Sequence, residues 1–192
     1  FQRTGYRRGL LQDPWKVLTI TGYKSLNIVM LGYRGTGKSV IAKILSKELR
    51  RHLYRIDDLI AQTAGKSISE FVKQEGWPGF RKLESDIVSR VAGEAQGSVI
   101  DCGGGVVLDD KNMVLLKKKG KCVLLTASLS AIIRRIKKDP TRPALVEGLR
   151  FEEEQKKILS DRHEKYQSCA DFICDTTTSK PGETAHEIIA FF

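Results

Sequence analysis

Short apolar runs alternate with longer amphipathic stretches along the chain from residue 26 onward. The short runs have the length of buried strands, and five of them lie at 26–31, 52–56, 97–101, 121–126 and 170–175. Between them, apolar residues recur every three or four positions, as they do on one face of a helix. This alternation is typical of βαβ units, so the sequence predicts an α/β fold with a five-stranded parallel sheet.

Three helical segments lie between these strands. Residues 39–51 repeat apolar side chains such as Ile41 and Leu45 on one face, and residues 80–91 carry a similar stripe. A third helix ends in a run of lysines, which suits the partial negative charge of a helix C-terminus. Gly120 lies just beyond that run, where a terminating glycine is expected.

Two stretches interrupt the alternation. Residues 57–95 form an inserted helical segment that is longer than a simple crossover requires. Residues 137–151 contain two prolines, a glycine and several charges, and loops of this length in a compact domain are usually functional or disordered. A chain of 192 residues fits one domain, which we place at residues 26–192.

Composition and charge limit the function classes. Hydrophobic residues make up 41% of the chain, and no apolar run approaches the roughly 20 residues of a membrane-spanning helix. The formal net charge of +10 suits a protein that binds anions, whether nucleic acid, acidic lipid or small phosphates and carboxylates. Part of this charge lies in residues 1–25, where five basic residues accompany one acidic residue. We interpret this stretch as a basic extension without an assigned function.

The four cysteines bear on the cellular compartment. Cys102, Cys122, Cys169 and Cys174 show no paired spacing, and a domain of this size needs no disulfides. We therefore expect small buried side chains in a reducing cytoplasm. We also expect no secretory signal, because no apolar segment with a small-residue cleavage site opens the sequence.

The strongest chemical signal is GYRGTGKS at residues 32–39, which matches the phosphate-loop pattern G-x-x-x-x-G-K-S between a predicted strand and a predicted helix. Glycines let backbone amides turn toward a phosphate, and the following helix N-terminus adds partial positive charge. Lys38 is expected to reach the β- and γ-phosphate oxygens of ATP, and the Ser39 hydroxyl to bind Mg²⁺. An ordinary glycine-rich turn is the competing interpretation, and the flanking elements count against it. The predicted nucleotide-binding residues of this loop are Gly32, Gly35, Thr36, Gly37, Lys38 and Ser39.

Further stretches narrow the activity. IDDLI follows the second predicted strand, GFRKLE lies in the inserted segment, CGGGV follows the third strand, and TRPAL and DRHEKY lie in and after the loop at 137–151. In this order the set resembles the shikimate kinases, and the resemblance covers about residues 26–190. It implies a three-layer α/β/α phosphate-loop fold with sheet order 2-3-1-4-5. It also implies a shikimate-binding insert at residues 57–95 and a mobile lid at residues 137–151.

The resemblance assigns an acceptor site. Arg81 and Arg162 would bind the shikimate carboxylate, because a planar guanidinium fork matches a carboxylate better than a point charge does. Glu84 lies one helical turn after Arg81 and is expected to hold its guanidinium. Asp57 would accept the proton of the reacting hydroxyl. Three glycines at the end of the third strand would let the substrate ring approach the backbone: Gly103, Gly104 and Gly105.

Plainer interpretations exist for these acceptor residues. Without the surrounding motif, Arg81 would be an exposed charge on a helix surface. The three glycines would be a flexible loop.

Three residues complete the nucleotide side by resemblance. Arg142 would be the lid arginine that neutralises charge on the transferring phosphoryl group. Arg135 would stack on adenine, and Pro181 would line the other side of that pocket. The alternatives are that Arg135 is a solvated helix residue and that Pro181 is an ordinary helix-start proline.

The chain departs from the family after the second strand. Shikimate kinases usually carry D-x-D there, with the first Asp assisting Mg²⁺, but Arg55 occupies the first position and Asp57 the second. Asp58 falls one place further, where a carboxylate in the first turn of a helix is sufficient explanation. We hypothesise that Asp101, at the end of the third strand, replaces the missing metal carboxylate, and that one of the three aspartates balances Arg55. The competing interpretation of Asp101 is a strand-end turn residue.

The sequence therefore predicts an enzyme that converts ATP and shikimate into ADP and shikimate 3-phosphate in aromatic amino acid biosynthesis. We expect a cytoplasmic monomer that uses Mg²⁺ and has no nucleic-acid or membrane partner. Two alternatives stay open at this point. One is a kinase for another small hydroxylated acceptor, and the other is a non-catalytic module that binds nucleotide or nucleic acid. The second lacks the aromatic-interleaved basic stripe typical of single-strand binders.

Overall fold

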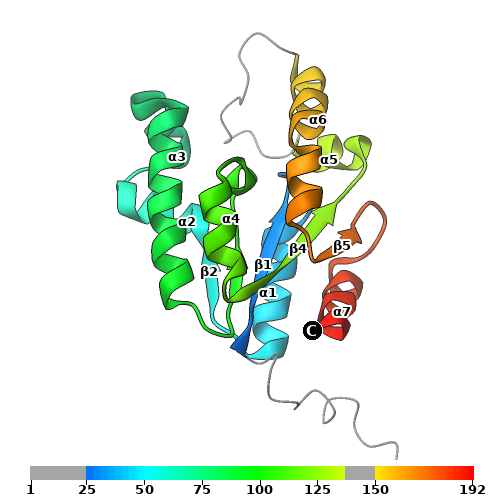
Figure 1. Ribbon diagram of the computed structural model, residues 1–192. Coiled ribbons are helices and arrows are strands. Elements are labelled where there is room, and N and C mark those ends of the chain that lie inside the picture. Colours follow the sequence, from blue (N-terminus) through cyan, green and yellow to red (C-terminus); the bar gives the residue numbers. More distant parts are fainter. Residues whose placement is uncertain (1–24, 137–149) are drawn as a thin grey trace, which may run out of the picture.

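A parallel five-stranded sheet forms the centre of the molecule (Figure 1). The computed structural model describes residues 25–136 and 150–192. The strand order is β2-β3-β1-β4-β5, as the sequence predicted. The strands are β1 (Asn27–Gly32), β2 (Leu53–Arg55), β3 (Val99–Asp101), β4 (Gly120–Thr126) and β5 (Phe172–Asp175).

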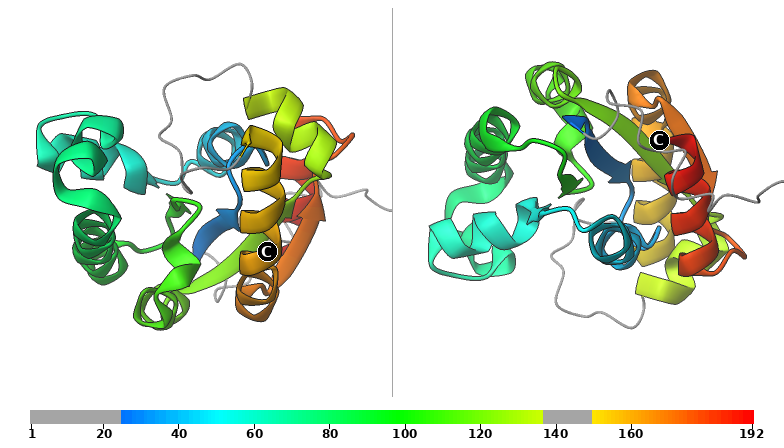
Figure 2. Two further views of the ribbon diagram at one scale, coloured as in Figure 1. Left: turned by 90° about the horizontal axis from the view of Figure 1, so that it is seen from above. Right: turned by 90° about the horizontal axis from the view of Figure 1, so that it is seen from below.

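Helices connect the strands and cover both faces of the sheet. Figure 2 shows α1 and α4 on opposite sides of the central strands. A short 3-10 turn at Val106–Leu108 follows β3. The helices are α1 (Lys38–Leu49), α2 (Ile56–Ala64), α3 (Ile68–Glu94), α4 (Asp110–Lys117), α5 (Leu129–Ile136), α6 (Phe151–Cys169) and α7 (Pro181–Phe191).

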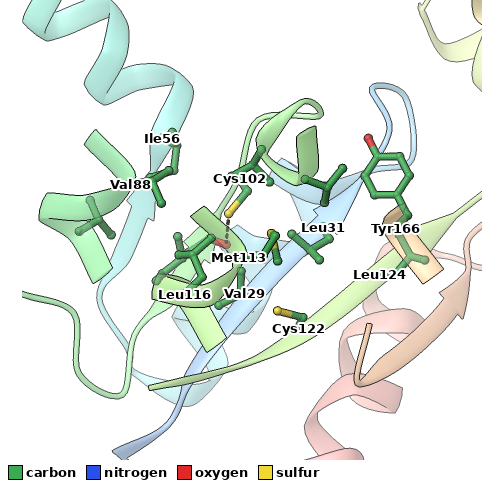
Figure 3. Close-up of a cluster of buried hydrophobic side chains, with 14 of the residues drawn as sticks. Val29, Leu31, Ile56, Val88, Cys102, Met113, Leu116, Cys122, Leu124 and Tyr166 are labelled. Atoms are coloured by element: carbon green, nitrogen blue, oxygen red, sulfur yellow. Dashed lines mark hydrogen bonds between the residues drawn. The ribbon is translucent and has the colours of Figure 1, made fainter. Parts of the chain in front are cut away.

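The alternation of side chains along β1 divides the core into two layers. Ile28 and Met30 pack with residues of α1 and α7, and Val29 and Leu31 pack with residues of α3, α4 and α6. Successive strand residues point to opposite faces of a sheet, so a central strand that is apolar throughout serves two layers. Figure 3 shows the second layer, where Val29 lies beside Leu116 of α4. The three-layer architecture is thereby confirmed.

The inserted region consists of α2 and α3, which project from the β2 edge of the sheet (Figure 1). Helix α3 is divided at Gly76, whose φ of 68° and ψ of 176° are not helical. Pro78 follows in the first turn of the second half, where its missing N–H removes no helical hydrogen bond. This break sets the direction of the second half, which carries Phe80, Arg81 and Glu84 toward the sheet.

Several predicted boundaries differ from the structure. Ile56 begins α2 instead of ending β2, and α1 ends at Leu49, two residues before the predicted limit. Gly120 is the first residue of β4 and not a helix cap. A Cβ there would lie 2.8 Å from Val29 Cγ2 and 2.9 Å from the Leu116 carbonyl oxygen, so close packing explains this glycine. The predicted loop at 137–151 is too long, because α6 begins at Phe151; residues 137–149 lie outside the described part.

The cysteines agree with the expectation except at one position. All four are free thiols, and Cys102, Cys122 and Cys174 are buried, but Cys169 is only partly buried. Burial raises the pKa of Cys122 and of Cys174 to about 12, so both stay protonated at neutral pH. Within residues 25–136 and 150–192, no helix combines the length and apolarity needed to cross a bilayer.

Candidate active site

The phosphate loop lies between β1 and α1, as the motif predicted. Gly37 precedes the helix with φ of 93°, in the left-handed region that favours glycine. Thr36 Oγ1 donates a 2.7 Å hydrogen bond to the Tyr33 carbonyl oxygen, and Lys38 Nζ donates a 3.1 Å hydrogen bond to the same oxygen. The Lys38 side chain is therefore folded over the loop, where a phosphate would replace or extend this contact.

A pocket of about 490 Å³ opens beside this loop. Its lining includes the loop, the loop after β5 and the start of α7, which are far apart in the sequence. The predicted nucleotide-binding residues that line it are Gly35, Thr36, Gly37, Lys38, Ser39, Arg135 and Pro181. Gly32 lies behind the loop, with φ of 135° and no room for a Cβ against the Leu125 carbonyl oxygen. The structure thus brings the described residues of the nucleotide prediction into one pocket, except Gly32.

Arg135 is tied to two segments of this pocket. Its Nη1 donates to the Gly35 carbonyl oxygen at 3.1 Å and to Thr176 Oγ1 at 3.2 Å. The alternative of a solvated helix residue is therefore wrong. Pro181 is the first residue of α7 and also lines the pocket, so the helix-start and pocket interpretations hold at once.

A second pocket, of about 400 Å³, lies between the inserted region and the glycine loop at 103–105. All seven residues predicted for the acceptor line it: Asp57, Arg81, Glu84, Gly103, Gly104, Gly105 and Arg162. Trp77, Phe80 and Ile68 add apolar surface. Eight of the nineteen lining residues are charged, so apolar surface and many charged groups together suit a small polar molecule that must be held in one orientation.

Arg81 and Glu84 form the expected ion pair. Arg81 is 27% exposed, and its guanidinium carbon lies 5.0 Å from the Phe80 ring centroid and 5.5 Å from that of Trp77. The interpretation of Arg81 as a plain surface charge is therefore wrong. Burial raises the pKa of Glu84, although the Arg81 guanidinium lowers it.

Two of the three glycines of the loop, Gly103 and Gly105, have no room for a Cβ because charged groups lie close to them. A Cβ on Gly103 would lie 2.7 Å from Glu84 Oε1 and 2.8 Å from Asp57 Oδ1. A Cβ on Gly105 would collide with the Arg81 guanidinium. Asp57 and Glu84 consequently converge on the same face of the loop, and the charge of Asp57 raises the pKa of Glu84 further.

Helix α6 fixes the middle of the glycine loop. Arg162 Nη1 donates a 2.9 Å hydrogen bond to the Gly104 carbonyl oxygen, and the Tyr166 hydroxyl donates to the same oxygen. Burial raises the pKa of Tyr166 to about 12, so this hydroxyl remains a donor at neutral pH. Sequence reasoning did not single out Tyr166, although it is the last letter of the DRHEKY stretch.

Arg55 contacts two of the three aspartates considered for it. Its Nη1 pairs with Asp58, and its Nε lies 3.7 Å from Asp101 Oδ2. Asp101 is 7% exposed at its side chain and stands opposite Arg55 in the register of β2 and β3. Asp58 is therefore more than a helix-start carboxylate, because it is an ion-pair partner of Arg55.

The two pockets meet at a shared wall. Arg34, Ser39, Asp57, Asp101 and Gly104 line both of them. A group transferred from a molecule in one pocket to a molecule in the other would pass these residues. Arg142, the predicted lid arginine, lies outside the described residues.

The comparisons agree on one family. A shikimate kinase family model matches residues 34–192. Two shikimate kinases, from Syntrophus aciditrophicus and Thermodesulfovibrio yellowstonii, are each 37% identical to this chain. The alignments cover 91% of this chain and 95% of the first relative, and 85% of this chain and 92% of the second.

A solved structure gives the same result. The shikimate kinase from Acinetobacter baumannii in complex with shikimate superposes with a TM-score of 0.82 at 25% identity, covering 88% of this chain and 93% of the other. The family model spans most of the chain, and the relatives match over nearly their whole length. The chain belongs to the shikimate kinase family, whose members are ATP-dependent kinases that transfer phosphate to a shikimate hydroxyl.

Proposed function

We propose that this chain performs the family reaction at the shared wall of its two pockets, with ATP in the pocket beside the phosphate loop and shikimate in the pocket beneath the inserted helices. The observation that carries this assignment is that Asp57 and Ser39 line both pockets. One is the carboxylate predicted for the reacting hydroxyl, and the other is the hydroxyl at the end of the phosphate loop. Donor and acceptor would thus meet without crossing the sheet.

Asp57 is proposed as the group that orients the 3-hydroxyl of shikimate and accepts its proton as the phosphoryl group transfers. Its carboxylate lies at Gly103, on the acceptor side of the wall. Lys38 would stabilise the negative charge on the β- and γ-phosphate oxygens, and Arg142 would add a second cation from the lid. Phosphoryl transfer needs this positioning and charge neutralisation more than covalent participation of the protein.

Arg81 and Arg162 are proposed to bind the shikimate carboxylate from two elements. Glu84 holds the first guanidinium, and the Gly104 carbonyl oxygen holds the second. Each arginine keeps further N–H groups for the ligand, because a guanidinium has five donors. Two preorganised forks would fix the ring so that a single hydroxyl faces Asp57.

Mg²⁺ is the metal that the family chemistry implies, and the residues at the wall fit it. Ser39 offers a hydroxyl oxygen and Asp101 a buried carboxylate, which are the hard oxygen ligands that Mg²⁺ prefers. The described residues contain no group of three or more His, Cys, Asp or Glu side chains that could hold a metal, so phosphates and water would complete the shell. Held by Ser39 and Asp101, Mg²⁺ would neutralise negative charge on the phosphates of ATP.

Arg55 is consistent with relocation of the metal carboxylate to Asp101. It stands where the family has the first Asp of D-x-D, and its Nε is 3.7 Å from Asp101 Oδ2. The Arg55 guanidinium beside Asp101 would hold this carboxylate in position at the shared wall. We therefore propose that Asp101, supported by Arg55, assists Mg²⁺ in this chain.

The reaction is tested by shikimate-dependent formation of ADP, with a series of other acceptors in parallel. We expect turnover with shikimate, and Asp57→Asn is expected to lower kcat at least 100-fold, since general base catalysis contributes about 10²–10⁴-fold. Asp86→Asn, on an exposed part of α3, serves as the matched control. Turnover restricted to an acceptor without a carboxylate would refute the roles of Arg81 and Arg162.

The metal assignment is tested by binding rather than by rate. Calorimetric titration of Mg²⁺ into the ADP complex should give an affinity about 10-fold weaker in Asp101→Asn than in the unmodified protein. Asp86→Asn again serves as the control. An unchanged Mg²⁺ affinity in Asp101→Asn would show that Asp101 is a strand-end residue without a metal role.

We also propose that the chain acts as a cytoplasmic monomer without nucleic-acid or membrane partners. All four cysteines are free thiols, as a reducing compartment requires. Light scattering should give a mass near 21.5 kDa. A stable dimer, or a gel shift with single-stranded nucleic acid at physiological salt, would refute the corresponding part of this proposal.

A further inference from the structure

A buried polar cluster joins the phosphate loop to α6, and of its four residues only Arg34 also lies in the shared wall of the two pockets. Tyr33 and Arg34 belong to the loop, and Glu154 and Gln155 belong to the first turn of the helix. Tyr33 and Gln155, which are in contact, are 122 positions apart along the chain. Gln155 is 0% exposed, and Tyr33 is 2% exposed. Burying polar groups costs free energy of folding unless they are hydrogen-bonded, so these four side chains need partners within the cluster.

The contacts within the cluster are closely connected. The Tyr33 hydroxyl donates a 2.6 Å hydrogen bond to Gln155 Oε1. Arg34 Nε donates at 3.2 Å to the same oxygen and also at 3.2 Å to the Tyr33 hydroxyl oxygen. Arg34 Nη2 lies 3.4 Å from Glu154 Oε2, and Gln155 Nε2 donates to that carboxylate at 2.7 Å. Burial raises the pKa of Tyr33, so its hydroxyl keeps the proton that this network uses.

The same helix holds the glycine loop further along. Arg162 and Tyr166 both donate to the Gly104 carbonyl oxygen. Positions 155, 162 and 166 recur with helical periodicity on one face of α6. A rise of 1.5 Å per residue puts about 10 Å between Gln155 and Arg162. One rigid helix face therefore contacts the phosphate loop at one end and the acceptor-side loop at the other.

We propose that Tyr33, Arg34, Glu154 and Gln155 form a positioning network that couples the nucleotide site to the shikimate site. A nucleotide that fixes the phosphate loop would strengthen the Tyr33–Gln155 and Arg34–Glu154 contacts. These contacts hold α6, and α6 carries Arg162 and the support of Gly104. Nucleotide binding therefore raises the affinity for shikimate, and shikimate raises the affinity for nucleotide by the same factor.

Charge supports a positioning role for Arg34 instead of a direct ligand role. Its guanidinium is 10% exposed and already faces the Glu154 carboxylate, which is 5% exposed. An arginine neutralised by a buried carboxylate contributes less field to a phosphate than an unpaired cation would. Arg34 nevertheless lies at the shared wall, because it lines both pockets. The inference rests on the proposed placement of shikimate at Arg162.

The test measures the dissociation constant of shikimate by calorimetry, with and without saturating ADP. We expect a ratio of at least about 5 for the unmodified protein, within the usual range of coupling between two sites. Tyr33→Phe removes only the hydroxyl and should reduce this ratio to below about 2, while shikimate affinity without ADP stays within about 2-fold. Tyr54→Phe is the matched control, because the Tyr54 hydroxyl makes no hydrogen bond with the described residues; its ratio should not change.

Glu154→Gln is the second variant, and it keeps the shape of the side chain while removing its charge. It should also reduce the ratio, so the conclusion does not depend on the folding of one variant. If both variants keep the full ratio of shikimate dissociation constants without and with ADP, the proposal is wrong. It is also wrong if shikimate affinity weakens equally with and without ADP, because an unchanged ratio indicates a merely structural role. A ratio of one in an unmodified protein that still turns over shikimate would reject the coupling and leave the proposed function intact. Failure of turnover with shikimate would reject the function itself.

Discussion

At the scale of single residues, Glu84 connects the electrostatics of the acceptor pocket to pH. It is 1% exposed, it pairs with Arg81, and it lies near Asp57 at the face of Gly103. Burial and the Asp57 charge raise its pKa, and Arg81 opposes them. The anionic form of Glu84 holds Arg81 in place. The ionisation of Glu84 therefore determines whether the Arg81 guanidinium is preorganised for the shikimate carboxylate.

We predict that shikimate binding weakens on acidification. The weakening should begin at a higher pH than it would if Glu84 had the pKa of an ordinary glutamate. Glu84 is ionised above its pKa and neutral below it, and that pKa is raised from the ordinary value of 4.5. Protonation would remove the charge that holds Arg81, so KM for shikimate should rise as pH falls through this raised pKa. The pH dependence of KM checks this, with Glu84→Gln as the comparison.

Glu84→Gln should have a high KM that lacks this acid limb, because it has no group to protonate. The loss of one charge-assisted pair should raise KM about 10- to 150-fold, which corresponds to the roughly 1.5–3 kcal/mol of such a hydrogen bond. If KM of Glu84→Gln rises at low pH as it does in the unmodified protein, another group is responsible for the rise.

At the scale of elements, the break in α3 decides where the acceptor residues point. Gly76 has backbone angles that residues other than glycine rarely adopt, and it directly precedes Trp77 and Pro78. An unbroken helix over Ile68–Glu94 would aim Phe80 and Arg81 elsewhere. The apolar stripe at 80–91 predicts a helical insert but not this break, whose local signals are Gly76 and Pro78.

We predict that Gly76→Ala destabilises the protein by about 1–3 kcal/mol, the usual cost of forcing a side chain into such a conformation. KM for shikimate should rise as well, because Arg81 moves with the second half of α3. Urea unfolding gives the free energy. Gly93→Ala in the same helix is the control, since a Cβ there meets no atom within 4 Å, and it should be neutral or stabilising by up to about 1 kcal/mol. Equal effects of the two substitutions would contradict the explanation.

At the scale of the whole molecule, the net charge of +10 has a local and a general part. Six cations and four carboxylates line the two pockets, which leaves a positive excess there: Arg34, Lys38, Arg55, Arg81, Arg135 and Arg162 against Asp57, Asp58, Glu84 and Asp101. Such a concentration of charge attracts small anions and raises their local concentration.

We predict that this field makes substrate binding sensitive to salt. Raising the salt concentration from about 0.05 to 0.5 M shortens the screening length from well above 10 Å to a few ångströms, so KM for shikimate should rise several-fold with less than a twofold change in kcat. Steady-state kinetics in two different potassium salts checks this and separates ionic strength from competition by one anion. A KM that does not respond to either salt would show that the carboxylate is recognised by short-range contacts alone.

The sequence by itself determined the elements and the chemistry that each of them carries. Apolar runs fixed the five strands to within two residues at each end, because strand and helix periodicity is local information. The phosphate-loop motif and the ordered motifs after it located residues that the structure brings into two adjoining pockets. The position of Asp101 beside the phosphate-loop strand also followed from the predicted sheet order, and Met30 faces it in the register.

Only the tertiary structure decided which distant polar groups hold one another. The pairing of Arg55 with Asp101, the hydrogen bond of Tyr166 to Gly104 and that of Tyr33 to Gln155 join separate segments of the chain. The last two contacts span 62 and 122 positions. No local pattern encodes such a contact, because its partners are chosen by the packing of whole elements and by the need of buried donors and acceptors to be satisfied.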